Sequence, residues 1–333
     1  MHDPLASDTL LPSRRAFIAR LLGAVAVAPA IARADSWPVK PIRIVVPFAS
    51  GGAPDILARL MAAEMGRGLG SAFVDNRGGA GGNVGADVVA KAPPDGYTLL
   101  LTTTATQSIN PALYPSMPYD AAKDFSAVSL VANTPLMLVT AKDSPIASFA
   151  DLIARAKAQP GTVTYASAGV GTMQHMVAEL VDDRTGARML HVPYKGTGPV
   201  MPDLLSRRVD VMFNSVAAVG NFVKEGRLRA LAVTTPKRLP AWPNVPTIAE
   251  SGVPGFEASA WYALFGPARL PREIVARLNA ELARIVALPA VRDRYAELGL
   301  EPAHSTPEEL DALVRRDLET WTRIIKAKGI KSP

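Results

Sequence analysis

Apolar and polar positions alternate along this chain in two different rhythms. Short runs of apolar, mostly β-branched residues are followed by longer segments in which apolar residues recur every three or four positions. The first pattern is typical of buried strands and the second of amphipathic helices. The first such unit consists of a strand over 42–46, a loop over 47–53 and a helix over 56–66. Repetition of this unit predicts an α/β protein whose sheets carry helices on their faces.

The same rhythm divides the chain into two lobes. The strand–loop–helix pattern returns after residue 138. The proline-rich segment 236–254 is predicted to be an ordered segment that crosses back to the first lobe. The last helices are expected to pack on the first lobe. For residues 214–228 the sequence predicts neither a helix nor a strand. Further strands are predicted at 72–75, 97–101, 128–132, 136–140, 163–167, 189–193, 209–213, 229–234 and 258–265. Further helices are predicted at 86–92, 149–158, 173–184, 200–206, 271–288, 290–298 and 306–327.

The first 34 residues have the organisation of a secretory signal. Arg14 and Arg15 precede an apolar run of small residues from Leu21 to Ile31, and Ala32 and Ala34 have the small side chains that a signal peptidase requires. The arginine pair favours the twin-arginine route, with an ordinary Sec signal as the alternative. The sequence therefore predicts cleavage near Ala34 and an exported, periplasmic chain.

Composition excludes several kinds of site. The chain has no cysteine, and its four histidines, at positions 2, 175, 191 and 304, follow no metal-ligand spacing. Lysine and arginine are scattered and form no basic run interleaved with aromatic residues, so nucleic acid is not an expected partner. We predict neither a metal nor a cofactor.

Four loops that follow predicted strands are rich in Gly, Ser and Thr and poor in charge. They span 48–55, 102–106, 167–172 and 194–198. Backbone N–H groups and hydroxyls of such loops hold small anions, and ligands of open α/β sheets bind beyond the carboxyl ends of the strands. One such loop alone is commonly only a turn. Four of them in two similar lobes favour an anion site, in which Asp55 either contacts the ligand or complements the helix dipole.

The same residues also allow two other types of site. Glycines at 79, 81 and 85 resemble a dinucleotide fingerprint, but the third is one position late and no acidic residue follows at a strand end. Ser167, with His175 or His191 as its base, is the candidate nucleophile of an exported serine hydrolase, although the glycine that precedes the serine in a nucleophile elbow is missing. A base within hydrogen-bond reach of Ser167 would favour the hydrolase.

Motifs spread over the whole chain after the signal resemble the tripartite tricarboxylate transporter receptors, or Bug family, of periplasmic solute-binding proteins. The resemblance begins with Trp37-Pro and continues to Pro254-Gly-Phe256 in the family's order. The motifs that carry it include Pro41-Ile-Arg-Ile-Val-Val-Pro-Phe48, Gly51-Gly52, Asp75-Asn-Arg77, Gly79-Ala-Gly-Gly82, Pro94-Asp-Gly-Tyr-Thr-Leu99, Asn110-Pro-Ala-Leu-Tyr114, Tyr165-Ala-Ser-Ala-Gly169, His191-Val-Pro-Tyr-Lys-Gly196 and Leu231-Ala-Val-Thr234.

The resemblance implies a two-lobed periplasmic binding protein of the Venus-flytrap type, with the ligand in the cleft between the lobes. The first lobe would comprise 35–138 and 259–333, and the second 139–258. The family's ligands are small carboxylates, here a dicarboxylate, tricarboxylate, amino acid or aromatic acid. The contacts implied for this chain are Phe48, Ala49, Ser50, Gly51, Asp55, Thr103, Thr104, Ser167, Gly169, Thr172, His175, Asn214 and Ser215.

The same resemblance implies a monomeric receptor, not an enzyme, that hands its ligand to membrane subunits of a tripartite tricarboxylate transporter. A ligand sensor that feeds a two-component kinase is the other role within the family. Two departures stand out: Ser50 occupies a position where the family often has proline, and 206–208 replaces a common Gly-Gln pair. The first adds a hydroxyl to the expected site, whereas the second is expected to lie away from it.

Overall fold

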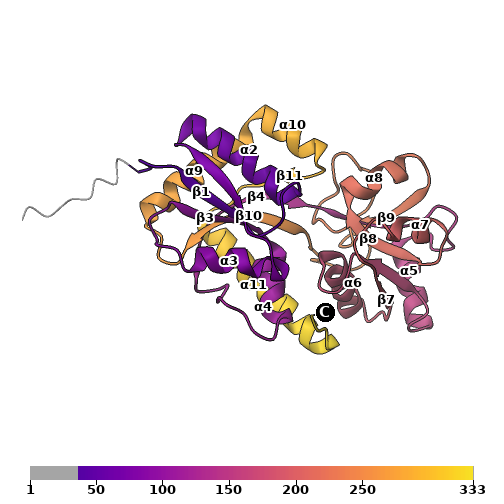
Figure 1. The fold of residues 1–333 in the computed structure, drawn as a ribbon. Coiled ribbons are helices and arrows are strands. Elements are labelled where there is room, and N and C mark those ends of the chain that lie inside the picture. The colour runs from indigo at the N-terminus through magenta and orange to yellow at the C-terminus, as the bar shows by residue number, and fades with distance from the viewer. Residues whose placement is uncertain (1–36, 333) are drawn as a thin grey trace, which may run out of the picture. The chain divides into compact units, whose positions relative to one another are not determined.

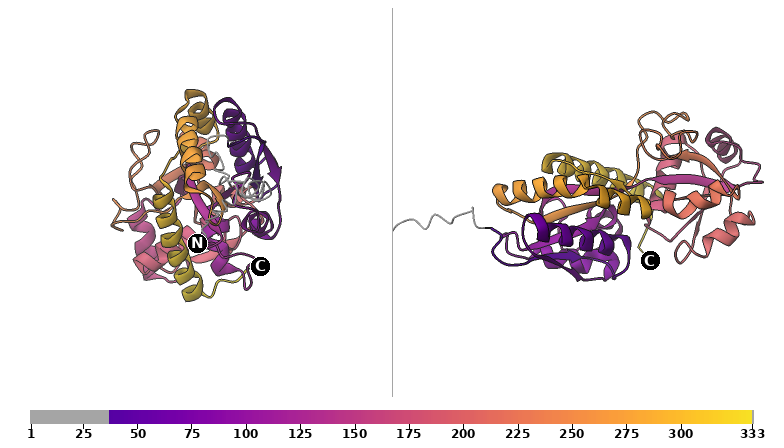
Figure 2. Two further views of the ribbon diagram at one scale, coloured as in Figure 1. Left: turned by 90° about the vertical axis from the view of Figure 1, so that its left-hand side faces the viewer. Right: turned by 90° about the horizontal axis from the view of Figure 1, so that it is seen from above.

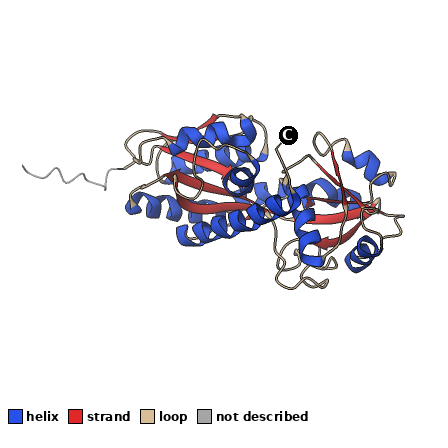
Figure 3. Ribbon diagram, turned by 90° about the horizontal axis from the view of Figure 1, so that it is seen from below, coloured by secondary structure: helices blue, strands red, loops and turns tan. Residues whose placement is uncertain are grey.

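The computed structural model describes residues 37–332, so the predicted signal peptide over 1–34 lies outside the described part of the chain. Two mixed β-sheets, each with helices on both faces, form two lobes (Figure 1; Figure 3). No helix within 37–332 has the length and apolar character needed to cross a bilayer. The predicted α/β class is confirmed.

The sheet of the first lobe combines segments from both ends of the chain. Its strand order is β11-β4-β10-β3-β1-β2, with β1, β2 and β3 parallel and β10 antiparallel to both β3 and β4. Helices α2 and α9 lie side by side on it (Figure 2). The elements of this lobe are β1 (Ile42–Val46), α2 (Ala53–Gly68), β2 (Ala72–Asn76), η2 (Ala80–Gly82), α3 (Asn83–Ala90), β3 (Thr98–Thr103), the π-helical turn η3 (Ala105–Ile109), α4 (Asn110–Leu113), β4 (Phe125–Thr134), β10 (Ala260–Pro267), α9 (Arg272–Ala287), α10 (Pro289–Glu297), β11 (Glu301–Pro302) and α11 (Pro307–Lys328).

The sheet of the second lobe has the order β7-β6-β8-β5-β9, in which β6 is parallel to β7 and β8, and β5 is antiparallel to β8 and β9. Leu138 of β5 packs into one core beside the sheet and Met137 into the other, as the alternation of side chains along a strand requires. The elements of this lobe are β5 (Leu136–Ala141), α5 (Phe149–Ala158), β6 (Thr164–Ser167), α6 (Met173–Thr185), β7 (Leu190–Pro193), α7 (Val200–Leu205), β8 (Val211–Ser215), α8 (Val216–Lys224) and β9 (Leu228–Val233).

Helix α11 contributes to the cores of both lobes. Leu310 and Val314, in its first half, pack with the first sheet's Val45 and Leu100. Trp321 and Ile324, in its second half, belong to the core beside the second sheet. The helix begins with the predicted capping box, in which the Thr306 and Glu309 side chains and backbones bond reciprocally. One continuous helix therefore connects the two cores.

The structure corrects two sequence predictions in the second lobe, since one strand lies two residues later than predicted and one helix was missed. The strand predicted at 209–213 runs from Val211 to Ser215, and α8 occupies most of the segment that received no element. Valines and a glycine have low intrinsic helix propensity, which hid α8 in the sequence. Val219 and Gly220 are nevertheless buried, so packing of one face stabilises this helix.

The departure at 206–208 forms the end of helix α7. The Arg207 N–H bonds to the Leu204 carbonyl and the Arg208 N–H to the Asp203 carbonyl, which is the Schellman pattern. Arg207 has φ of 59°, the left-handed conformation for which glycine is preferred. Arg207 thus holds, with strain, a conformation that glycine adopts easily.

Candidate functional site

The loop after β1 is folded onto the side chain of Asp55. The Gly51 N–H donates to Asp55 Oδ2 over 2.9 Å, and Arg59 Nε donates to the same oxygen over 3.0 Å. Asp55 is only 3% exposed. The hydrogen bond from Arg59 holds the pKa of Asp55 below its ordinary value, although burial acts in the opposite direction. Asp55 therefore fixes the shape of its own loop, while Phe48 is half-buried and Ala49, Ser50 and Gly51 are exposed.

The glycine-rich run over 78–85 is a packing surface for this loop. A Cβ atom on Gly82 would lie 3.3 Å from Phe48 Cζ, and one on Gly78 would lie 3.6 Å from Ala49 N. A Cβ atom on Gly85 would lie 2.7 Å from Pro47 Cα, closer than real Cβ contacts. The run that resembles a dinucleotide fingerprint thus lets its backbone approach the loop after β1.

The end of β3 lies beside β1 because the two strands are a parallel pair. Thr104 is buried, and its Oγ1 accepts a hydrogen bond of 2.9 Å from the Trp261 N–H of β10. Thr103, the last residue of β3, is half-buried. Thr106 and Gln107 are fully buried, and their side chains make no hydrogen bond to another residue within 37–332. Parallel pairing thus brings Phe48–Asp55 and Thr103–Thr104 to one edge of the first sheet.

The loop after β6 forms the corresponding edge of the second sheet. Ser167 Oγ lies 3.1 Å from both the N and the O atoms of Gly169, and Thr172 Oγ1 donates to the same Gly169 carbonyl over 2.7 Å. Gly169 has φ of 137°, which only glycine adopts easily. Leu113 of α4, from the first lobe, packs against Gly171 in this loop. The loop is tightly ordered by its own hydrogen bonds.

Asn214 and Ser215 end the neighbouring parallel strand, β8. Asn214 is buried, and its Oδ1 accepts a hydrogen bond of 2.8 Å from the Ser215 N–H. Ser215 is half-buried and directly precedes α8. Pairing of β6 with β8 therefore gathers Ser167, Asn214 and Ser215 at one sheet edge, as predicted for the ends of parallel strands.

Two stacked histidines lie beneath the loop after β6. The rings of His175 and His191 are 3.9 Å apart and nearly parallel, at 7°. His175 Nδ1 accepts a hydrogen bond of 3.1 Å from the Gly171 N–H, and His191 Nε2 lies 2.7 Å from Ser167 Oγ. Burial and the neighbouring His191 lower the pKa of His175 to about 4, and burial also lowers the pKa of His191. His191 is a functional candidate that the sequence prediction considered only for a hydrolase.

The structure supplies the base that the serine hydrolase alternative requires, since His191 is within hydrogen-bond reach of Ser167. Ser167 is, however, fully buried in this structure, a constraint that applies to a substrate carbonyl and to a ligand carboxylate alike, and its hydroxyl also meets Gly169. The Ser167–His191 pair alone therefore does not establish a catalytic site.

Among residues 37–332, no cluster of His, Asp and Glu has the arrangement of a metal site.

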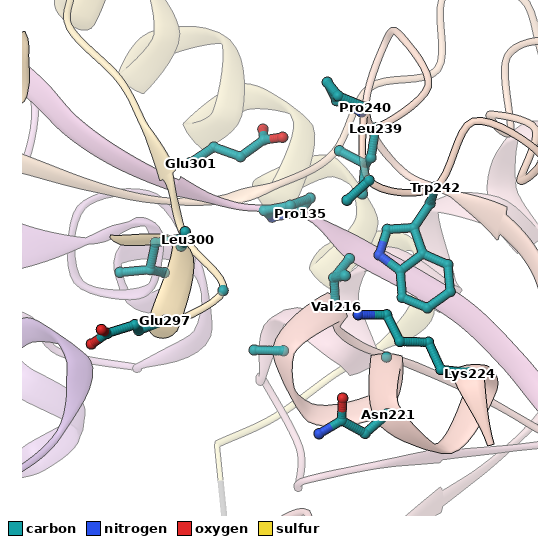
Figure 4. Close-up of a pocket in the computed structure, with 15 residues that line it drawn as sticks. Pro135, Val216, Asn221, Lys224, Leu239, Pro240, Trp242, Glu297, Leu300 and Glu301 are labelled. Atoms are coloured by element: carbon teal, nitrogen blue, oxygen red, sulfur yellow. The ribbon is translucent and has the colours of Figure 1, made fainter. Parts of the chain in front are cut away.

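A separate cavity of about 410 Å³ lies between α8, the loop over 239–242 and the α10–β11 turn (Figure 4). Trp242 and Lys224 line it from one side and Glu301 from the other. None of the residues that line it belongs to the predicted contact set. A second cavity, of about 390 Å³, is lined by both His175 and His191.

Comparison with known proteins gives consistent results over most of the chain. Residues 57–330 match the family model of the tripartite tricarboxylate transporter family receptor. A UPF0065 protein encoded in the tcbD-tcbE intergenic region of Pseudomonas sp. (strain P51) is 40% identical over 328 residues, which cover 98% of this chain and 97% of the relative.

Two solved structures with bound ligands are also similar. Rpa4515 of R. palustris, solved with adipate, is 38% identical, with a TM-score of 0.71 over 89% of this chain and 99% of the other. MatC (Rpa3494) of Rhodopseudomonas palustris, solved with bound malate, is 33% identical, with a TM-score of 0.69 over 87% of this chain and 100% of the other.

Proposed function

We propose that this chain, which belongs to the tripartite tricarboxylate transporter receptor family, captures a small carboxylate in the periplasm and delivers it to the membrane subunits of such a transporter. The observation that carries the proposal is the pair of loop clusters at the carboxyl ends of parallel strands, one cluster in each sheet. Relatives solved with adipate and with malate support a dicarboxylate as the ligand.

The chemistry of the two clusters suits a carboxylate. Hydroxyls of Ser50, Thr103 and Ser215 and the backbone N–H groups of the exposed loop residues are donors, and the predicted contact set contains no Lys or Arg. Neutral donors that are fixed by their own hydrogen bonds recognise an anion without the full cost of burying a cation. His175 contributes to binding indirectly. Its Nδ1 accepts a hydrogen bond from the Gly171 N–H and so helps to order the loop after β6. The family is one of transport receptors and not of enzymes, so Ser167 serves binding rather than hydrolysis.

The proposal includes closure about a hinge of the two lobes, which the sequence predicts at 35–138 with 259–333 and at 139–258. Because β5 begins at Leu136 and belongs to the second sheet, the first boundary lies before Leu136 and not at 138. The chain passes between the sheets at Pro135 and again over 234–259. Arg323 and Lys328, in the second half of α11, bind Asp183 and Glu179 of α6 at 2.8 and 3.2 Å. Two ion pairs thus join this half of α11 to the second lobe, while its Trp321 and Ile324 share a core with Ile109 and Leu113 of the first lobe.

Isothermal titration with a panel of dicarboxylates, tricarboxylates, amino acids and aromatic acids tests the proposal. At least one dicarboxylate is expected to bind with a stoichiometry near one, because a single cleft holds one ligand. The matched control is the diamide of the same carbon length, which lacks the negative charges and is expected not to bind. Failure of the whole panel, together with hydrolysis of a test ester, would support the hydrolase instead.

Replacing Asp55 with asparagine separates a ligand contact from a loop anchor. Asparagine still accepts from the Gly51 N–H but gives Arg59 no charged partner, so we expect a loss of about 1 kcal/mol in unfolding free energy and little change in affinity. Since the pKa of Asp55 is lowered in the folded protein, this difference should be present above its ordinary value of 3.8 and vanish at lower pH. Urea denaturation and calorimetry measure the two effects. A large loss of affinity at unchanged stability would instead identify Asp55 as a direct contact.

A further inference from the structure

Two buried imidazoles support the loop that the proposed function assigns to the ligand. Ser167 Oγ is 2.7 Å from His191 Nε2, and the Gly171 N–H is bonded to His175 Nδ1. Both ends of the loop after β6 thus rest on a histidine ring. The pairing of β6 with β7 places His191 directly beside Tyr165, whose ring stacks on it at 4.8 Å.

The hydroxyl of Ser167 has one proton and several neighbours that compete for it. It accepts from the Gly169 N–H, and both the Gly169 carbonyl and an unprotonated His191 Nε2 are acceptors for its proton. When Ser167 donates its proton to a ligand carboxylate, His191 Nε2 can turn from acceptor to donor towards Ser167, as the Nε2–H tautomer or as the imidazolium. The charge of the carboxylate also favours a protonated imidazole one hydrogen bond away.

We propose that His191 is a positioning residue for the Ser167 hydroxyl and that the receptor takes up a proton on the His175–His191 pair when a carboxylate binds. This inference rests on the proposed function. On this inference, the affinity for a carboxylate depends on the protonation of the His175–His191 pair, and not only on hydrogen-bond donors whose protonation never changes.

The proton goes to His191 and not to His175. Since Nδ1 of His175 accepts from Gly171, a proton at that atom would break the bond that orders the loop. Two cationic rings at a separation of 3.9 Å would also repel each other strongly, so the pair accepts one additional proton. Burial of His175 lowers its pKa to about 4, which agrees with this order of protonation.

Charged groups from each neighbouring element bear on the pair. Glu179 of α6 lies 3.8 Å from His175 Nε2 and accepts from the Tyr165 hydroxyl of β6 over 2.7 Å. Lys328 of α11 lies 3.2 Å from Glu179. The charge of Glu179 raises the pKa of His191 against the larger effect of burial. Arg188, Lys331 and Asp182 also line the cavity that borders the pair.

Calorimetry in two buffers tests the inference on the wild-type protein. The observed enthalpy of carboxylate binding is measured at about pH 6.5 in PIPES and in Bis-Tris, which both buffer at this pH. The two values differ by the number of protons taken up times the difference between the ionisation enthalpies of the two buffers. We expect uptake of a fraction of one proton, and a dissociation constant that increases severalfold as the pH rises from about 6 to about 8, since one unit of pKa shift equals a tenfold change. The ligand must be fully ionised over this range.

His191→Gln keeps a hydrogen-bonding group near Ser167 but does not titrate, so its proton uptake and pH dependence are expected to disappear while binding persists. The matched control is His304→Gln, because His304 is exposed and its Nε2 lies 3.2 Å from the Asn279 carbonyl oxygen, away from the His175–His191 pair. This variant is expected to retain the wild-type proton number. Ring nitrogen NMR of the wild-type protein, with and without ligand, needs no variant and should show a raised His191 pKa in the complex.

Ligand binding without proton uptake by the wild-type protein would overturn the inference and leave the proposed function intact. Proton uptake that persists in His191→Gln would overturn it as well, because another group would then carry the proton. Absence of binding by every carboxylate of the panel would overturn the proposed function, and the inference with it.

Discussion

Gly85→Ala is expected to destabilise the protein by about 1–3 kcal/mol and to abolish most of its carboxylate affinity. A Cβ atom at this position would lie 2.7 Å from both Pro47 Cα and the Arg77 carbonyl oxygen. Both atoms belong to the backbone, so no side-chain rotation relieves the overlap. Because Pro47 directly precedes Phe48, the loop of the first contact cluster must shift. Urea denaturation and calorimetry with the best ligand of the panel measure the two losses.

Gly66→Ala is the matched control for this substitution. Gly66 is also a helical glycine, but it is exposed on α2 and a Cβ atom there would meet nothing within 4 Å. Alanine in a helix interior is more favourable than glycine by about 0.5–1 kcal/mol, so this variant should be slightly more stable and bind normally. If Gly85→Ala behaves like Gly66→Ala, close packing against Pro47 does not hold the loop after β1.

The role of the glycine-rich run could not be read from the sequence. Its spacing only showed a poor match to a dinucleotide fingerprint. Gly82 and Gly85 approach Phe48 and Pro47, which lie more than thirty positions earlier in the chain. The local sequence shows only that the backbone at a glycine can lie close to another segment. Which segment lies there depends on the tertiary fold.

The loop clusters, in contrast, could be predicted from local pattern. Apolar runs that end in Gly, Ser and Thr predicted the carboxyl ends of β1, β3 and β6, and the crevice rule for open sheets then placed these ends together. The roles of individual residues within the clusters required register. His191 reaches Ser167 because β7 pairs with β6 in the register Tyr165↔His191, and a sequence does not specify such a register.

The effect of Asp317 on stability could likewise not be predicted from the sequence, because Asp317 is one of many acidic residues on an amphipathic helix. In the structure its Oδ2 accepts a hydrogen bond of 2.8 Å from Trp261 Nε1, in a cavity that Arg184 and Glu257 also line. Burial raises the pKa of Asp317 to about 6. The folded protein therefore binds a proton at this carboxyl more tightly than the unfolded chain, where the ordinary value is 3.8.

Asp317→Asn is accordingly expected to stabilise the protein at neutral and alkaline pH. A carboxyl whose pKa is raised by folding loses stability as the pH rises from its unfolded to its folded value, and asparagine has no such proton to lose. A shift of about two units corresponds to about 3 kcal/mol at most, so we expect a gain of about 1–3 kcal/mol near pH 8 that disappears below about pH 4. Asparagine Oδ1 can still accept from Trp261, so the hydrogen bond is retained.

Urea denaturation at about pH 4 and about pH 8 measures this difference, with Asp293→Asn as the matched control. Asp293 is exposed on α10, and its replacement should change the unfolding free energy by less than about 0.5 kcal/mol at both pH values. A loss of stability in Asp317→Asn near pH 8 would contradict the expectation, because it would mean that the Asp317 charge is matched by Arg316 and Trp261 well enough to outweigh burial. Since Trp261 also donates through its N–H to Thr104, a gain without any change in ligand affinity would further show that the buried carboxyl is not needed to place that threonine at the end of β3.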